Sequence, residues 1–162
     1  MNSAERRKRY ERIVEQLEEL LTKCDDRTAQ CATTAALLHH KVPGVSWTGF
    51  YFIKGEELIV DAYQGPVACQ LLEQHTGVCW AAIDNDATQI VADVHAIESH
   101  IACDANSRSE VVVPIHDTTG KPIGVLDIDS HRPDHFDEVD GAGYESVVKL
   151  LEKTWNTFPD RA

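Results

Sequence analysis

The order of helix and strand signals predicts an α+β sandwich, in which terminal helices cover one face of a mainly antiparallel sheet of about six strands. Three observations predict this fold class: amphipathic helices at both ends of the chain, a run of short β-prone segments between them, and hairpin connections within that run. A length of 162 residues fits one domain. Because no linker or internal repeat divides the chain, we expect residues 1–162 to form a single domain.

The first 24 residues predict an amphipathic helix. Its apolar side chains recur at the helical spacing of three and four residues: Tyr10, Ile13, Val14, Leu17, Leu20 and Leu21. Residues 23–26 interrupt this pattern, and Asp25 or Asp26 can cap a second helix, which the pair Pro43-Gly44 ends. The apolar face of the first helix has two alternative uses, closing over the sheet or contacting a second copy of the chain in a homodimer.

Two hairpins dominate the middle of the chain. Residues 46–53 are rich in aromatic and β-prone side chains, and a turn at 54–56 leads to a return strand that begins at 58–60. Residues 110–115 and 123–128 form the second pair of runs, joined across a Thr-Thr-Gly turn. Consecutive strands joined by short turns pair in antiparallel fashion, which is why we expect a mainly antiparallel sheet.

The segments between and after the two hairpins carry weaker signals for short strands and helices. Residues 67–73 and 88–94 are expected to form short strands, with a short helix at 78–83 between them. After Phe136, Asp137 caps a closing helix. The apolar side chains of this helix fall roughly on one face: Val139, Tyr144, Val147, Val148, Leu151 and Trp155.

Residues 93–107 fit neither the helical nor the strand period, which predicts a structureless loop. Loops of about 15 residues are uncommon in compact domains and are usually functional or disordered. This one contains three side chains that can bear chemistry, His95, His100 and Cys103.

The charge and hydropathy of the chain exclude several classes of function. Its 27 acidic and 15 basic residues give a net charge of −12, which repels nucleic-acid phosphates and disfavours nucleic-acid binding. No apolar run approaches the roughly 18 residues of a membrane span, and no apolar stretch follows the basic N-terminus as in a secretory signal. We therefore expect a cytoplasmic protein that contacts no membrane.

Five cysteines occur in the sequence, and in a cytoplasmic protein they are expected to be catalytic, metal-binding or buried rather than structural disulfides. Cys24 and Cys31 lie in or near helices and are expected to be small buried side chains. Cys79 lies at a helix start, where free N–H groups favour a thiolate. Cys103 lies in the long polar loop, and Cys69 follows a Gly-Pro break. The last three together indicate a thiol site.

A metal site is the alternative use of these side chains. His95, His100 and Cys103, with Cys79 as a fourth ligand, have suitable chemistry. However, zinc sites usually contain at least one close ligand pair, and the chain has no CxxC or HxxxH pair. We therefore expect no metal and no cofactor.

Strand alternation predicts an acidic and aromatic pocket. Asp127 and Asp129 share one face of their strand, and Glu110 begins the neighbouring strand. Trp47 and Tyr51 share a face of the first strand. Because clustered carboxylates repel each other, at least one is expected to keep its proton near neutral pH and to be able to donate it, while ionised neighbours hold an ammonium group. The alternative is a solvated strand end beside ordinary aromatic packing.

The chain closely resembles the GAF-domain free methionine-(R)-sulfoxide reductases. The resemblance lies in IVADVHAIESHIACDANSRSEVVVPIHDTTGKPIGVLDIDS, in SWTGFYFI, and in the G-x-x-A-C and G-V-C elements, and it covers about residues 42–144. Its most specific parts are HIACD, SEVVVP and GVLDIDS. The resemblance implies a GAF-like fold and an enzyme that reduces free L-methionine-(R)-S-oxide to methionine.

The resemblance also implies roles for the three cysteines of the thiol site. Cys103 corresponds to the nucleophile, Cys69 to the resolving thiol, and Cys79 to a third cysteine that acts as a secondary disulfide partner. The disulfide formed in each cycle is reduced by a thioredoxin-like dithiol. A non-catalytic GAF module that binds a small ligand or senses redox state is the alternative function, because a fold does not fix a function.

The acidic and aromatic residues match the family as well. Glu110, Asp127 and Asp129 correspond to carboxylates that bind substrate and aid proton transfer, and Trp47 and Tyr51 to aromatics around its methyl-sulfoxide end. The chain departs from the family pattern after G-V-C, where a tryptophan replaces the usual glycine. This bulky side chain is expected to narrow the pocket or to restrict movement during recycling.

Overall fold

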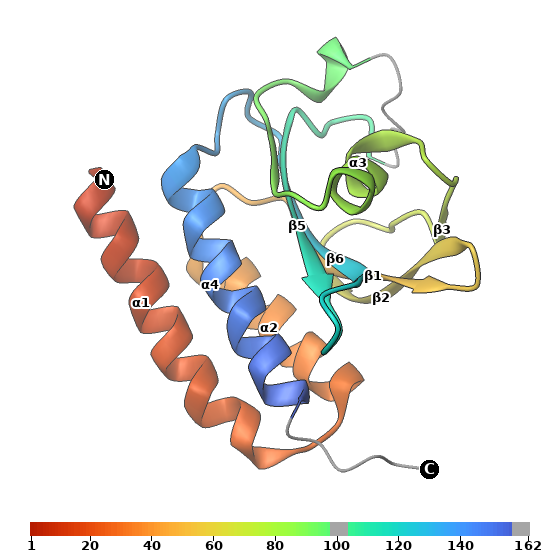
Figure 1. The fold of residues 1–162 in the computed structure, drawn as a ribbon. Helices are drawn as coiled ribbons and strands as arrows, with labels where there is room; N and C mark the ends of the chain where they lie inside the picture. Colours follow the sequence, from red (N-terminus) through yellow and green to blue (C-terminus); the bar gives the residue numbers. More distant parts are fainter. Residues whose placement is uncertain (98–103, 157–162) are drawn as a thin grey trace.

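Six strands form one sheet in the computed structural model, which describes residues 1–97 and 104–156 (Figure 1). The strand order is β3-β2-β1-β6-β5-β4, and every neighbouring pair is antiparallel. The strands are β1 (Trp47–Lys54), β2 (Glu57–Gln64), β3 (Leu71–Leu72), β4 (Gln89–Val91), β5 (Ser109–His116) and β6 (Pro122–Ser130). The predicted fold class is confirmed, and β1, β6 and β5 lie at the centre of the sheet.

Within the described residues, four α-helices flank the sheet: α1 (Ser3–Leu20), α2 (Arg27–Lys41), α3 (Gly77–Asn85) and α4 (Glu138–Trp155). The predicted caps are present, because the Asp26 carboxylate accepts the Ala29 amide hydrogen at 2.9 Å and the Asp137 carboxylate accepts that of Val139 at 2.9 Å. None of the helices in the described part of the chain is long and apolar enough to cross a membrane.

Helices α1, α2 and α4 gather on one face of the sheet, which we call the helical face (Figure 1). There α1 lies alongside α4. The Tyr10 hydroxyl donates to Asp140 at 2.8 Å, and Arg6 donates to Asp140 at 2.8 Å and to Asp137. The packing of the terminal helices on one face, predicted from sequence, is confirmed. Leu20 departs from the predicted apolar stripe, since it is 37% exposed.

Gly143 allows α1 and α4 to approach closely. A Cβ atom added at this position would collide with the ring of Tyr10. The same ring stacks edge-on against Tyr144 with 5.2 Å between centroids. A side chain at position 143 would therefore push α1 away from α4 and from the buried side chains that the two helices share.

The opposite face of the sheet, which we call the pocket face, has a thinner cover. Helix α3 lies there and packs against β5 and β6. A second and smaller hydrophobic cluster fills this face. Its members from the central strands are Trp47, Tyr51, Val112 and Val125.

Several predicted boundaries were wrong. The strand predicted at 67–73 contains only Leu71–Leu72, because its pairing with the edge of β2 spans two residues. The strand predicted at 88–94 is Gln89–Val91. The loop predicted to be structureless begins with a 3-10 turn, Val94–Ala96, in which the Asp93 carboxylate accepts the His95 amide hydrogen. Such a turn leaves no periodic signal in the sequence.

The two helical cysteines differ from each other. Cys31 is buried as predicted, but Cys24 is exposed, so that prediction was wrong. The reason is local, because α1 continues as a 3-10 turn, Leu21–Lys23, and Cys24 then adopts an extended backbone outside both helices. Its carbonyl accepts a hydrogen bond from the buried Gln30 side chain at 2.9 Å.

Candidate functional site

The register of three central strands aligns the predicted acidic and aromatic residues. Asp129 on β6 lies opposite Trp47 on β1 and opposite Glu110 on β5. Asp127 lies two residues along β6, opposite Gly49. Because side chains two residues apart on a strand share a face, these groups meet on the pocket face. The predicted meeting of acidic and aromatic faces is confirmed.

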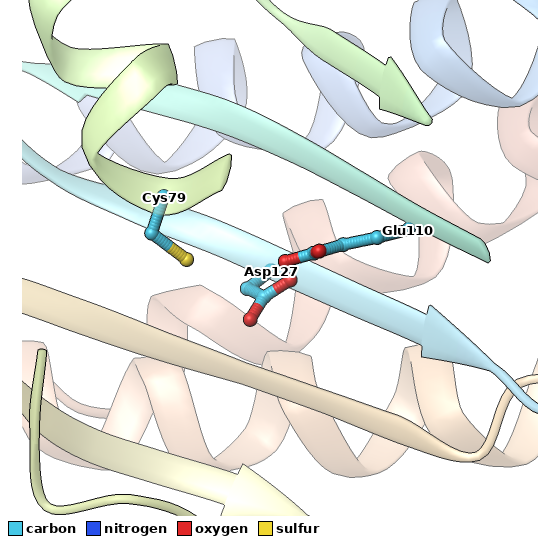
Figure 2. Close-up of side chains that lie close together, drawn as sticks. All are labelled: Cys79, Glu110 and Asp127. Carbon is cyan, nitrogen blue, oxygen red and sulfur yellow. The ribbon is translucent and has the colours of Figure 1, made fainter. Parts of the chain in front are cut away.

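Helix α3 adds a thiol above this row. Cys79 is the third residue of the helix, which packs over β5 and β6. Figure 2 shows the side chains of Cys79, Glu110 and Asp127 converging from these three elements. Their ligand atoms all lie within 4.8 Å of one another.

A pocket opens over these groups. It lies between β1, β5 and β6 on one side and α3 with the loop before β3 on the other. Its lining contains no lysine or arginine among the described residues. The lining residues are Trp47, Tyr51, Val67, Ala68, Leu72, Thr76, Gly77, Val78, Cys79, Asp104, Ser107, Glu110, Asp127 and Asp129.

Burial raises the pKa of all three carboxyl groups, by different amounts. It raises the pKa of Glu110 well above its ordinary value, and the charges of Asp127 and Asp129 raise it further. Burial and the Asp127 charge likewise raise the pKa of Asp129, against the hydrogen bond from Ser107. Burial raises the pKa of Asp127 to about 6, although hydrogen bonding by its neighbours opposes this shift. The prediction of a retained proton agrees with these shifts.

The prediction of a thiolate at Cys79 was wrong. Burial raises the pKa of the Cys79 thiol well above its ordinary value, and the negative charges of Asp127, Glu110 and Asp129 raise it further. The helix start of α3 is present, but its favourable field is outweighed by desolvation and by three nearby carboxylates. Cys79 is therefore a neutral thiol in the pocket.

Aromatic rings form one wall of the pocket. Trp47 stacks on Tyr63 with 5.2 Å between ring centroids and on Tyr51 with 5.8 Å. Gly49 leaves room for this arrangement, because a Cβ atom there would collide with Tyr63 and with the Trp47 ring. The Tyr51 hydroxyl donates to the carbonyl oxygen of Cys69 at 3.0 Å, which ties the loop before β3 to this wall.

Three buried polar atoms of the pocket have no hydrogen-bond partner among the described residues: Trp47 Nε1, Glu110 Oε2 and Asp127 Oδ1. A buried polar group without a partner costs about 1–3 kcal/mol. Buried groups left in this state on one face of one pocket indicate a site that a polar ligand completes.

The two ends of the long loop are anchored beside the pocket. His95 contacts the Ser107 carbonyl at 3.0 Å, and His131 contacts Asp104 at 2.8 Å. The Ser107 hydroxyl donates to Asp129 at 2.8 Å. Sequence reasoning missed Ser107 and Asp104, since single polar residues in an aperiodic loop carry no signal of their own.

The predicted thiol site is described in part. Cys103 and His100 lie outside the described residues. Cys69 lies in the loop before β3 and is disulfide-bonded, whereas Cys79 is a free thiol. The proposed metal alternative of His95, His100, Cys103 and Cys79 therefore stays untested as a set.

Trp80 does not narrow the pocket, so that part of the prediction was wrong, while its alternative, restricted movement during recycling, stays a prediction. Its side chain is buried in the cluster on the pocket face and is absent from the pocket lining. The indole N–H donates to the Leu72 carbonyl at 3.2 Å, and the ring packs against His75. Trp80 points away from Cys79 because successive helical residues project about 100° apart.

In the part of the chain that the structure describes, an antiparallel sheet with three helices on one face and an acidic pocket on the other defines the class of this protein, an α+β sandwich domain. The chain belongs to the GAF domain family, whose model matches residues 28–151. Within that family it is closely related to free methionine-R-sulfoxide reductases. It is 39% identical to the free methionine-R-sulfoxide reductase of Escherichia coli over 129 residues, which is 80% of this chain and 78% of the relative.

Solved structures give the same relationship. The free methionine-R-sulfoxide reductase of Neisseria meningitidis, in complex with its substrate, superposes with a TM-score of 0.86 at 39% identity, covering 91% of this chain and 88% of that one. The Staphylococcus aureus protein fRMsr, also in complex with substrate, superposes with a TM-score of 0.85 at 40% identity, covering 90% of this chain and 95% of that one.

Proposed function

We propose that this protein reduces free L-methionine-(R)-S-oxide to methionine with cysteine thiols. The observation that carries the proposal is the pocket itself, in which strand register aligns three carboxyl groups with an aromatic wall. Both the carboxyl groups and the aromatic wall contain buried polar atoms without a hydrogen-bond partner among the described residues. The close relationship to free methionine-R-sulfoxide reductases supports the same substrate class.

In the first step the Cys103 thiolate attacks the sulfoxide sulfur. The sulfoxide S–O bond then breaks as the oxygen is transferred to the Cys103 sulfur. The transient bond between the two sulfur atoms is cleaved, which leaves a sulfenic acid on Cys103 and releases methionine. Two electrons pass from the cysteine sulfur to the sulfoxide. A proton is supplied to the sulfoxide oxygen by Glu110 or Asp129, whose raised pKa values keep a proton available near neutral pH.

The pocket chemistry fits the two ends of this substrate. The ammonium group of a free amino acid can bind the carboxylates of the pocket, which have no lysine or arginine beside them in the lining. The methyl-sulfoxide end can pack against Trp47 and Tyr51, and the unpartnered Trp47 indole N–H offers one donor to a substrate oxygen.

Recycling needs a second thiol and an external reductant. Cys69 condenses with the Cys103 sulfenic acid, which releases water and forms a disulfide, and a thioredoxin-like dithiol reduces that disulfide by exchange. The hydrogen bond from Tyr51 to the Cys69 carbonyl holds the resolving cysteine beside the pocket wall. The buried neutral thiol of Cys79 is poorly suited to be the nucleophile, and we assign it the role of a secondary disulfide partner.

An epimer-resolved assay tests the proposal. The protein is incubated with racemic free methionine sulfoxide and dithiothreitol, and the two epimers are quantified separately. We expect consumption of the R epimer alone. Tight binding without consumption would instead favour the alternative of a non-catalytic ligand-binding or redox-sensing module. Methionine sulfoxide within a peptide, offered in parallel, is expected to remain unreduced.

A further inference from the structure

Cys79 is neither the nucleophile nor the resolving thiol of the proposed reaction, yet its thiol lies beside the carboxyl groups assigned to the substrate. It comes from α3, whereas Glu110 comes from β5 and Asp127 from β6. The three side chains are about 95% buried. Three regular elements therefore fix one sulfur and two carboxyl groups around a common space (Figure 2).

We propose that Cys79, Glu110 and Asp127 form a binding site for a thiophilic divalent cation such as Zn²⁺, and that the bound ion closes the pocket to substrate. The binding site is argued from the chain's own residues. The inhibitory consequence rests on the function proposed above.

The donor set selects the class of metal. Thiolate sulfur favours Zn²⁺ and Cd²⁺, whereas Mg²⁺ and Ca²⁺ require oxygen ligands throughout. Zinc bonds of about 2.0–2.3 Å place the ligand atoms of a tetrahedral site roughly 3.2–3.7 Å apart. The three ligand atoms already lie within 4.8 Å of one another, so small side-chain rotations complete the site.

Each carboxyl group of the cluster carries one oxygen that lacks a hydrogen-bond partner. Glu110 Oε2 and Asp127 Oδ1 are buried and have no such partner among the described residues. The pocket lining offers no lysine or arginine to neutralise these groups. A divalent cation would satisfy both oxygens and supply the missing positive charge, and this is a stronger indication than an acidic cluster alone.

Three protein ligands leave the fourth tetrahedral position directed into the pocket, as in zinc sites that keep an open position. An ion there occupies the space above two carboxylates that the proposed reaction assigns to substrate. It would exclude the substrate ammonium group by charge and by volume. Zn²⁺ is therefore expected to raise KM for the free sulfoxide, and a chelator is expected to restore it.

Cadmium titration of the full chain tests the site directly, because Cd²⁺–thiolate bonds give an ultraviolet charge-transfer band. Serine replaces Cys24, Cys69 and Cys103 in the starting variant, which leaves Cys79 and the buried Cys31 of the helical face. We expect the band to saturate at one Cd²⁺ per chain and to be displaced by Zn²⁺. Adding Cys79→Ser is expected to abolish the band and to weaken binding more than about 100-fold, since loss of even an outer-shell partner costs 10–100-fold.

Two matched carboxylate variants test whether Cd²⁺ binds at this specific site or is attracted only by the negative charge of the pocket. Glu110→Gln is expected to weaken Cd²⁺ binding strongly, whereas Asp104→Asn, in the same pocket lining but bonded to His131, is expected to leave it unchanged. A band that survives Cys79→Ser, or equal weakening by both carboxylate variants, would overturn the site. If the starting variant melts below the wild type, Zn²⁺ equilibrium dialysis of wild type against the single Cys79→Ser variant decides instead, and equal binding overturns the site.

The two proposals fail in different ways. A chain that binds Cd²⁺ through Cys79 but consumes no free sulfoxide would overturn the proposed function and leave the metal site standing. A chain that consumes the R epimer but binds no Cd²⁺ would overturn the metal site alone. In an active chain, excess free methionine-(R)-sulfoxide is expected to displace Cd²⁺, and a band that resists it would overturn the inhibitory role.

Discussion

The two faces of the sheet are built from the same strands but differ in function: the helical face forms the larger hydrophobic cluster, and the pocket face forms the candidate site. On β6, Leu126 and Ile128 are fully buried in the cluster of the helical face, whereas Asp127 and Asp129 point into the pocket. Burying a large apolar side chain contributes about 1.5–3 kcal/mol, while a buried polar atom without a partner costs about 1–3 kcal/mol. Burial on the helical face therefore offsets the free-energy cost of the unpartnered polar atoms on the pocket face. Adjacent residues of β6 serve the two purposes, because their side chains point to opposite faces of the sheet.

The largest effect is expected from the two thiols of the proposed reaction. Cys103→Ser should remove even a single stoichiometric turnover and lower activity at least about 1,000-fold, the scale on which loss of a catalytic nucleophile acts. Rapid-quench measurement of methionine formed without external reductant checks this. Cys69→Ser is the matched control, because it should allow one turnover and then block recycling. Full activity of Cys103→Ser would defeat the mechanism.

Glu110→Gln should separate activity from stability on the pocket face. Loss of one of the two proposed proton donors is expected to lower kcat/KM about 10²–10⁴-fold. Stability should stay the same or rise, because one of three crowded carboxyl groups becomes a neutral group of similar shape. Steady-state kinetics and thermal melting of the same preparation measure both. A large loss of stability would show that Glu110 is a structural residue.

Leu126→Ala should have the opposite effect, a loss of stability with little change in activity, although Leu126 is the neighbour of Asp127. Removing a fully buried side chain from the helical face is expected to cost about 2–5 kcal/mol of unfolding free energy. The folded fraction should keep kcat/KM close to the wild-type value. Urea unfolding followed by kinetics below the transition checks both. Leu126→Met, which conserves volume, should cost less than about 1.5 kcal/mol.

The smallest effect is expected at His116, which lies at the end of β5. Its ring contacts both α4 on the helical face, through Glu152 at 2.9 Å, and the end of α3 on the pocket face, through Asp86 at 2.5 Å. Burial lowers the pKa of His116, but the hydrogen bonds to both carboxylates outweigh this and raise it above 6.5. The pair energy of such partly exposed groups is at most about 1 kcal/mol.

Because the folded state raises this pKa, the stabilisation is complete below the unfolded pKa of about 6.5 and is lost as pH rises through the higher folded value. Unfolding free energies measured from mildly acidic to alkaline pH should therefore fall more in the wild type than in His116→Gln. Glu152→Gln should show a reduced fall. An identical pH dependence in wild type and His116→Gln would contradict the assignment.

The sequence predicted those parts of the site that follow from alternation and from strong local signals. Asp127 and Asp129 share a face because they are two residues apart on a strand, and the caps at Asp26 and Asp137 follow from side chains that accept nearby amide hydrogens. The strands at the sheet edges were predicted too long, since β3 pairs with only two residues of β2 and β4 with only three of β5. The roles of Ser107 and Asp104 had no local signal.

What the chain determined by itself was the fold class and the composition of each strand face, because both follow from residue periods of 2 and 3.6. Only the tertiary structure decided the state of Cys79 and the place of Trp80. Sequence position alone puts Cys79 at a helix start, which favours a thiolate, but packing of α3 over β5 and β6 buries that thiol beside three carboxyl groups. Desolvation and charge depend on what surrounds a group in space, and residues 79, 110 and 127 become neighbours only when the sheet and α3 come together.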